Sequence, residues 1–132
     1  RIRFTGDRSL EIEGVTTLKG AEHRVMPDRL EAASFAAAAL ATGGDVRLEG
    51  TTQDDCMAFI STVEAMGGGV DIHDDSIHVW RAGPLKAIDI RTDVYTGFAT
   101  DWQQPLAVAL TAAAATSHTR DPPLIATRPL LS

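Results

Sequence analysis

The residue of this sequence best placed for chemistry is Asp101, a carboxylate at the predicted start of a helix. A strand-like run at residues 85–91 precedes it, and a long apolar segment follows it. Between the strand and the helix lie Gly97, which gives the backbone extra conformational freedom, and Thr100, which stands three residues before Gln103 as in a capping box. A strand, a glycine loop and a helix that opens with an acid are suited to present one carboxylate at the mouth of a pocket.

A structural role explains the same acid without any chemistry. An aspartate in the first turn of a helix commonly interacts only with exposed backbone N–H groups and with the helix dipole. The residue types in the stretch 93–104 therefore leave two interpretations of Asp101 open, a catalytic carboxylate and an acid that only stabilises its helix.

Two blocks of sequence favour the catalytic interpretation because both resemble one family. Residues 97–106 are similar to the P-G-F-x-T-D-[MLW]-Q segment of the enolpyruvyl transferases of cell-wall synthesis, the UDP-N-acetylglucosamine 1-carboxyvinyltransferases. Residues 23–32 resemble the family's R-V-[IM]-P-D-R-[IL]-E-[AT] stretch, and residues 42–46 match the T-G-G-D-V that closes its alanine-rich helix. The resemblance runs from about residue 10 to about residue 115, and two blocks in the right order are more specific than either alone.

The resemblance implies transfer of the enolpyruvyl group of phosphoenolpyruvate to the 3-hydroxyl of UDP-N-acetylglucosamine, with release of phosphate. It identifies Asp101 with the catalytic aspartate, which would contact that hydroxyl and take its proton if it lies within hydrogen-bond reach and is partly shielded from water. Thr100 and Gly97 would bind substrate with it, Thr100 by fixing the aim of the carboxylate and Gly97 by letting the backbone approach the sugar. Two prolines of the family's loop are replaced here by Thr96 and Ala99, which predicts a less rigid loop. The resemblance implies neither a cofactor nor a metal.

The expected fold is α/β (α+β), built from the repeated βαβαββ units of the enolpyruvyl transferase inside-out α/β barrel and present here as an incomplete domain. From residue 23 to residue 80 the predicted order is strand, helix, strand, helix, strand, strand. The order then starts again, which indicates an internal repeat of roughly 70 residues. We expect the end of a preceding unit at residues 1–22, a complete unit at 23–83, the first half of the next at 84–116 and an irregular, proline-interrupted tail at 117–132.

Residue patterns predict the individual elements. Apolar residues at period two indicate strands, and apolar residues at helical spacing between capping and glycine signals indicate helices. Large side chains of the first helix, Leu30, Phe35 and Leu40, are expected to pack between its alanines. The predicted strands are 9–14 (half-buried), 23–26, 45–49, 70–73, 76–80 and 86–91, and the predicted helices are 28–42, 53–66 and 101–115.

Composition limits the class of protein. A chain of 132 residues fits one domain with a real core. Its net charge of −6 argues against nucleic acid or an anionic membrane as a partner. No apolar run is long enough to span a membrane, and no cleavable leader opens the sequence. Together with a single cysteine, these features predict a cytoplasmic protein.

Much of the family's active site has no counterpart in this sequence. Cys56 is expected to be a small buried hydrophobe, since it lies inside a helix with no adjacent base, and it does not replace the reactive cysteine of the family's mobile loop. That loop and most uridine contacts belong to the family's other domain. Arg128 lies near the distance of a family arginine, but its proline neighbours do not fit the motif, so its role is not carried over. We therefore expect no turnover by the isolated chain.

Three classes of function stay open. The leading one is a fragment of a UDP-N-acetylglucosamine 1-carboxyvinyltransferase, whose full enzyme binds UDP-N-acetylglucosamine and phosphoenolpyruvate in peptidoglycan precursor synthesis. A shikimate-pathway enolpyruvyl transferase shares the fold, although the block at residues 100–103 disfavours it. The third is a non-catalytic module that self-associates through uncovered apolar faces.

Other constellations have simpler explanations. Residues 73–78 offer histidine and aspartate as metal ligands, but no fourth ligand is evident and an exposed polar turn explains them better. Arg24 and Arg29 flank Asp28 and suit a bound phosphate, but the resemblance implies that this stretch follows the crossover between domains and favours an interdomain salt bridge. Trp80 and Trp102 are isolated aromatics and are expected to pack in the protein rather than to stack on a base.

Overall fold

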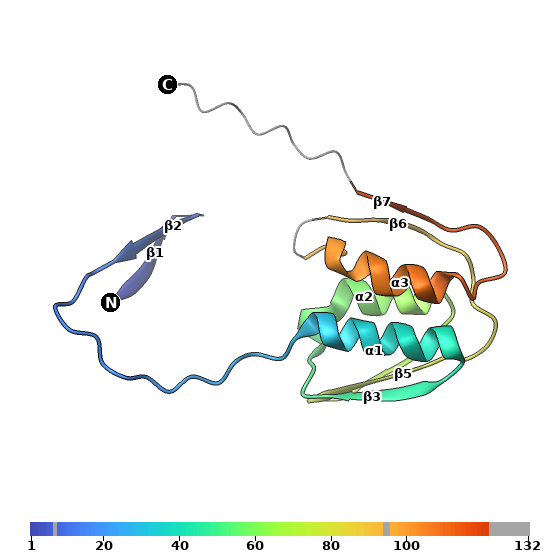
Figure 1. The fold of residues 1–132 in the computed structure, drawn as a ribbon, viewed down its shortest axis with the longest axis horizontal. Helices are drawn as coiled ribbons and strands as arrows, with labels where there is room; N and C mark the ends of the chain where they lie inside the picture. Colours follow the sequence, from blue (N-terminus) through green and yellow to red (C-terminus); the bar gives the residue numbers. More distant parts are fainter. Residues whose placement is uncertain (7, 94–95, 122–132) are drawn as a thin grey trace, which may run out of the picture.

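The computed structural model describes residues 1–6, 8–93 and 96–121 of the chain, and Figure 1 shows their arrangement. Helices α1, α2 and α3 lie side by side, with strands β3 and β5 on one side and the β6–β7 pair on the other (Figure 1). This mixture of helices and strands confirms the predicted α/β class. The elements in chain order are β1 Ile2–Gly6, β2 Ser9–Ile12, α1 Arg29–Thr42, β3 Asp45–Glu49, α2 Gln53–Ala65, β4 Gly69–Ile72, β5 Ser76–Trp80, β6 Asp89–Arg91, the 3₁₀ turn η1 Thr100–Trp102, α3 Gln103–Leu110 and β7 His118–Arg120.

Helix α1 begins and ends where its sequence predicts. The carboxylate of Asp28 accepts a hydrogen bond of 2.8 Å from the backbone N–H of Leu30, which satisfies one of the free donors of the first turn. The helix ends at Gly43, whose φ of 74° is a left-handed conformation that favours glycine. Small side chains let neighbouring elements approach closely, and the buried residues of α1 are Ala32, Ala33, Ala36, Ala37, Ala39 and Leu40.

Strands β3, β5 and β4 form an antiparallel sheet in that order, which confirms the predicted hairpin between β4 and β5. Side chains alternate between the two faces of a strand. Ile77 and Val79 of β5 are therefore buried in one core with residues of α1 and α2. Arg47 and His78, paired across β3 and β5, lie on the outer face. The core of the described chain lies between this sheet and the helices.

Helix α2 confirms the prediction for residues 53–66 to within one residue. Ile60 and Val63 are buried as expected, but Met57 is 45% exposed. In the first turn of the helix, Cys56 faces the core and Met57 does not. The predicted apolar stripe was therefore wrong by one residue at this point.

Strands β6 and β7 form a second pair, which is parallel, and α3 lies between them in the sequence. The prediction of an irregular tail from residue 117 is wrong at its start, because His118–Arg120 pairs with Asp89–Arg91. A strand, a helix and a parallel strand in succession form the usual crossover unit, and the prolines that suggested an irregular tail all come later in the sequence. The rest of the predicted tail, residues 122–132, lies outside the described residues.

The helix predicted at residues 101–115 is shorter than expected. It opens as η1, continues as α3 and ends at Leu110. The expected capping box does not form, because Thr100 is already the first residue of the turn and the cap position falls on Ala99, which has no side-chain acceptor. After the helix, Ala113 forms an isolated parallel bridge with Leu85.

Three predictions about burial and strand pairing are wrong, each at a surface that no other described element covers. Strand β2 forms but is not half-buried, because the β1–β2 hairpin stands apart from the body of the chain (Figure 1). Residues 23–26 do not form a strand, since no described strand lies beside them to pair with. Leu30 and Phe35 of α1 are exposed rather than packed. The predicted unit boundaries stay predictions. None of the described helices has both the length and the apolarity needed to cross a bilayer.

Candidate active site

Helices α1 and α2 and the η1–α3 segment begin at the same end of the molecule (Figure 1). There the guanidinium carbon of Arg29, the first residue of α1, lies 5.7 Å from the ring centroid of Trp102 in η1. Asp54 and Asp55, in the first turn of α2, line a hollow together with Gly97. Helix starts carry partial positive charge, which favours electronegative ligand atoms and is partly offset here by first-turn acids.

The hollow beside Gly97 has a volume of about 410 Å³. The loop before η1 forms one wall and the first turns of α2 form the other; the lining residues are Asp54, Asp55, Met57, Ala58, Thr96, Gly97 and Trp102. Gly97 is half-buried at this position. Of the predicted site residues, the structure therefore places Gly97 in this hollow, while Thr100 and Asp101 are absent from its walls.

Asp101 lies in the middle of η1, and its side chain is exposed. Within the part of the chain that the structure describes, its carboxylate makes no hydrogen bond and no ion pair. The group is therefore free to accept a hydrogen bond from a ligand hydroxyl. The partial shielding from water that the sequence analysis expected of a proton-accepting carboxylate is not found among the described residues.

The turn that carries Thr100 and Asp101 is bracketed by two buried aromatic residues, Phe98 and Trp102. Both rings contact Phe59 of α2. The expectation that Trp102 packs in the protein is confirmed. Residues 94 and 95, which belong to the stretch 93–104, lie outside the described residues.

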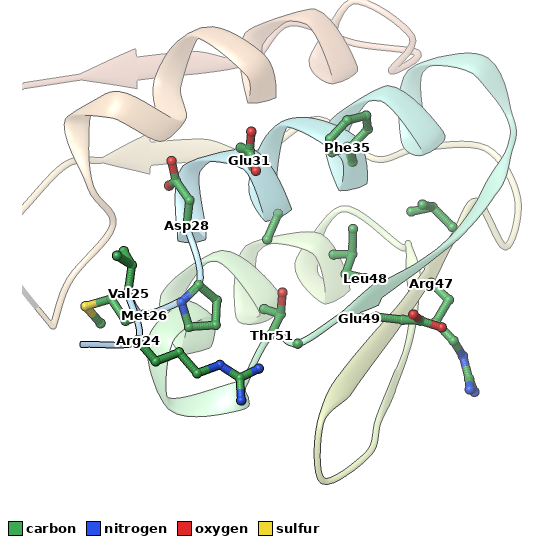
Figure 2. Close-up of a pocket in the computed structure, with 14 residues that line it drawn as sticks. Arg24, Val25, Met26, Asp28, Glu31, Phe35, Arg47, Leu48, Glu49 and Thr51 are labelled. Carbon is green, nitrogen blue, oxygen red and sulfur yellow. The ribbon is translucent and has the colours of Figure 1, made fainter. Parts of the chain in front are cut away.

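A larger hollow of about 780 Å³ lies between residues 24–28, α1 and β3. Figure 2 shows Arg24, Phe35 and Leu48 around it. Among the described strands, β3 pairs only with β5, so its other edge faces this hollow unpaired. The lining combines apolar side chains with charges of both signs, which suits an extended polypeptide segment better than a small anion.

Cys56 is buried inside α2. Burial, reinforced by the nearby charge of Asp55, raises the pKa of its thiol from the ordinary 9.0 to about 11, against the opposing effect of Arg29. A buried neutral thiol is a poor nucleophile. The prediction that Cys56 is a small hydrophobe rather than a reactive residue is confirmed.

The histidines of the hairpin bind neighbouring side chains. A ring nitrogen of His78 lies 2.7 Å from a carboxylate oxygen of Asp45, and a ring nitrogen of His73 lies 3.3 Å from the guanidinium of Arg47. No group of three or more metal-binding side chains gathers among the described residues. The ring of His78 also lies 4.8 Å from that of Trp80, which packs on the outer face of the sheet.

Sequence reasoning missed two features of this end of the molecule. It did not place Asp54 and Asp55 beside Gly97, and it did not find Phe59 beneath the turn of Asp101. The acids themselves were visible in the sequence, because α1, α2 and the turn η1 each carry an acid at their start, but their neighbours were not. No sequence pattern indicates the second, since the rings come from segments about forty residues apart.

Comparisons with known proteins agree on one family. A sequence model of the family described as EPSP synthase (3-phosphoshikimate 1-carboxyvinyltransferase) matches residues 1–122. UDP-N-acetylglucosamine 1-carboxyvinyltransferase 2 of Streptococcus thermophilus is 42% identical over 106 residues, which are 80% of this chain and 25% of the relative. The UDP-N-acetylglucosamine 1-carboxyvinyltransferase of Gluconacetobacter diazotrophicus is 45% identical over 113 residues, or 86% of this chain and 27% of the relative. The chain thus spans about a quarter of the length of these relatives.

Among solved structures, the enolpyruvyl transferase NikO from Streptomyces tendae has a similar fold. It aligns with a TM-score of 0.64 at 20% identity, over 74% of this chain and 23% of that one. At this identity the likeness shows the fold alone, and it confirms the fold that the sequence predicted.

Proposed function

This chain belongs to the EPSP synthase family, and on that premise we propose that it carries part of the active site of a UDP-N-acetylglucosamine 1-carboxyvinyltransferase. The full enzyme transfers the enolpyruvyl group of phosphoenolpyruvate to the 3-hydroxyl of UDP-N-acetylglucosamine. A C–O bond forms at that hydroxyl, phosphate leaves, and the hydroxyl proton passes to a base. The proposal implies a cytoplasmic enzyme of peptidoglycan precursor synthesis.

Asp101 is the proposed catalytic residue. Its exposed carboxylate, without a partner among the described residues, is available to accept the proton of the 3-hydroxyl. Thr100, beside it in η1, is proposed to bind substrate with it, and Gly97 lets the backbone approach the sugar. The single observation that carries the proposal is that this free carboxylate stands where three helices begin, in a chain 42–45% identical to enzymes of that name.

The shikimate-pathway enzyme is the second candidate, because the family description names 3-phosphoshikimate. The names of the curated relatives favour the first candidate, since they cover most of this chain at 42% and 45% identity. The local charge agrees with that preference, because Asp54 and Asp55 beside Gly97 disfavour a phosphate there and suit hydroxyl groups of a sugar.

Turnover requires more than this chain. The described residues supply one carboxylate and one glycine loop, but no second wall that would exclude water from Asp101. Since the chain spans about a quarter of its relatives, we propose that it binds the acceptor sugar weakly and does not complete the reaction alone.

The test is a pair of NMR titrations of ¹⁵N-labelled chain, one with UDP-N-acetylglucosamine and one with shikimate 3-phosphate. The proposal predicts saturable shifts of the amides of residues 97–104 with the nucleotide sugar only. Shifts with shikimate 3-phosphate only would favour the second candidate. No shifts with either ligand at millimolar concentration, from a folded sample, would reject both as binding activities of this chain.

A further inference from the structure

The direction in which the Asp101 side chain points is set by the backbone of its turn rather than by hydrogen bonds of its own carboxylate. That carboxylate has no hydrogen bond or ion pair within the described part of the chain. The cap residue before the turn, Ala99, contributes no side-chain bond either. Whatever fixes the direction of Asp101 must therefore act on the turn through the residues that flank it.

The two flanking aromatic residues are anchored firmly. Phe98 is 6% exposed and Trp102 is 2% exposed, although Thr100 and Asp101 between them are exposed. Each is also tied through the backbone: the N–H of Trp102 donates to the carbonyl of Ala99 at 3.0 Å, and the carbonyl of Phe98 accepts from the N–H of Asp93 at 2.9 Å. The turn is thus held at both ends while its middle faces outward.

Both anchors rest on one residue of another helix, Phe59 of α2. The ring of Phe59 lies 5.7 Å from that of Trp102 at 66°, and 6.4 Å from that of Phe98 at 23°. Phe98 and Trp102 contact each other edge-on, 5.5 Å apart at 74°. Three rings in mutual contact form a closed triangle, and such offset and edge-to-face contacts have a preferred geometry that aliphatic packing lacks.

The indole acts here through its ring rather than through its N–H. The Nε1 atom of Trp102 is buried and has no hydrogen-bond partner among the described residues. Its ring face instead meets the guanidinium of Arg29, 5.7 Å from the centroid. A phenyl ring at position 102 would keep the triangle and remove an unsatisfied donor, whereas an aliphatic side chain would remove the triangle.

We propose that Phe59 is a positioning residue for Asp101 and acts on it through Phe98 and Trp102. The role of Phe59 in catalysis rests on the proposed function, whereas its effect on the conformation of the turn does not. Phe59 belongs to another helix, about forty residues away in the sequence, and its ring contacts the rings on both sides of the turn. It is therefore the substitution site that changes the aim of the carboxylate without changing the loop.

The test compares Phe59→Leu with Val63→Ala, a control on the same buried face of α2 that is not itself one of the three rings. The amide shifts of Thr100 and Asp101 and the dissociation constant for UDP-N-acetylglucosamine are measured for both. We expect Phe59→Leu to move both amides and to weaken binding roughly tenfold or more, since small misplacements of a reacting group are costly. Val63→Ala is expected to leave the two amide shifts and the dissociation constant unchanged, even if it lowers the melting temperature as much as Phe59→Leu does.

A second pair separates positioning from simple stability. Trp102→Phe is expected to keep the amide shifts of Thr100 close to those of the parent chain, while Trp102→Leu is expected to move them as Phe59→Leu does. Equal effects of Phe59→Leu and Val63→Ala on those amides would overturn the positioning role. If the parent chain binds no nucleotide sugar, the proposed function fails, and the amide shifts alone still decide whether Phe59 sets the turn.

Discussion

The indole ring of Trp80 occupies the space where Gly69, its cross-strand partner in the pairing of β4 with β5, would carry a side chain. A Cβ atom at Gly69 would lie 2.0 Å from the nearest atom of that ring. The flat ring can therefore lie on the outer face of the sheet only because position 69 is glycine.

The first prediction follows from this contact. Gly69→Ala should lower the free energy of unfolding by about 1–3 kcal/mol, because the ring of Trp80 must move away. Urea denaturation measures the change. In a Trp80→Leu background the same substitution should cost much less, and an equal cost in both backgrounds would contradict the steric explanation.

The second prediction concerns the start of α1. Asp28→Ala removes the acceptor for the Leu30 N–H and should destabilise the chain by about 1 kcal/mol, as measured by chemical denaturation. Asp28→Asn keeps a side-chain acceptor and serves as the control, with a smaller loss expected. Equal losses for the two variants would mean that charge, rather than the hydrogen bond, matters at this cap.

The third prediction is a pH dependence. Burial raises the pKa of the Cys56 thiol to about 11, whereas the ordinary value of 9.0 applies to the unfolded chain. The folded state therefore holds the thiol proton more tightly than the unfolded chain does. The resulting contribution of Cys56 to the free energy of unfolding is fully present below pH 9 and is lost as the pH rises toward 11. A shift of this size corresponds to roughly 2–3 kcal/mol.

Urea unfolding of the parent chain and Cys56→Ala between pH 8 and 10.5 isolates this contribution, because other titrating groups are common to both. The free energy of unfolding of the parent chain, minus that of Cys56→Ala, should fall and can change sign as the pH rises. A difference that is constant with pH would contradict the raised pKa.

The fourth prediction is self-association through the β1–β2 hairpin. Ile2, Phe4, Leu10 and Ile12 pair across the two strands on one face, and each is at least half exposed, from 55% to 80%. An apolar face of this kind favours contact with another surface. Light scattering should show dimers or larger species, and Phe4→Ser with Leu10→Ser should reduce them.

The opposite face of the same hairpin provides the control. Arg3 and Glu11 form an exposed salt bridge of 3.0 Å there, so Arg3→Ser changes the hairpin without removing apolar surface. It should leave association unchanged. A parent chain that stays strictly monomeric at high concentration would contradict the prediction.

Local sequence patterns predicted most of the body of the fold. Asp28 and Gly43 mark the ends of α1 by their own chemistry, and alternation within residues 45–49 and 76–80 predicted β3 and β5. The failures share a physical cause, which is that burial and strand pairing depend on partners. Residues 9–14 alternate as a half-buried strand should, yet nothing described covers them, and residues 23–26 have no strand to pair with.

The site was predictable only in part. Motif resemblance predicted Gly97, Thr100 and Asp101 as site residues; Gly97 lines the hollow beside α2, whereas Thr100 and Asp101 do not. The sequence could not reveal that Phe59 lies under the turn η1, because contacts between distant segments leave no local pattern. The same limit applies to the strand β7, whose partner β6 lies on the other side of a helix in the sequence.

The most direct test of the proposed function is the dissociation constant of UDP-N-acetylglucosamine for the parent chain and for Asp101→Asn. Glu64→Gln, which removes an exposed carboxylate from the last turn of α2, is the control. We predict binding at least about tenfold weaker for Asp101→Asn, because a charged acceptor is replaced by a neutral one and an NH₂ donor faces the ligand hydroxyl. Its melting temperature should not change, and Glu64→Gln should bind like the parent. Equal affinities of the parent chain and Asp101→Asn would contradict a substrate-contacting role for Asp101.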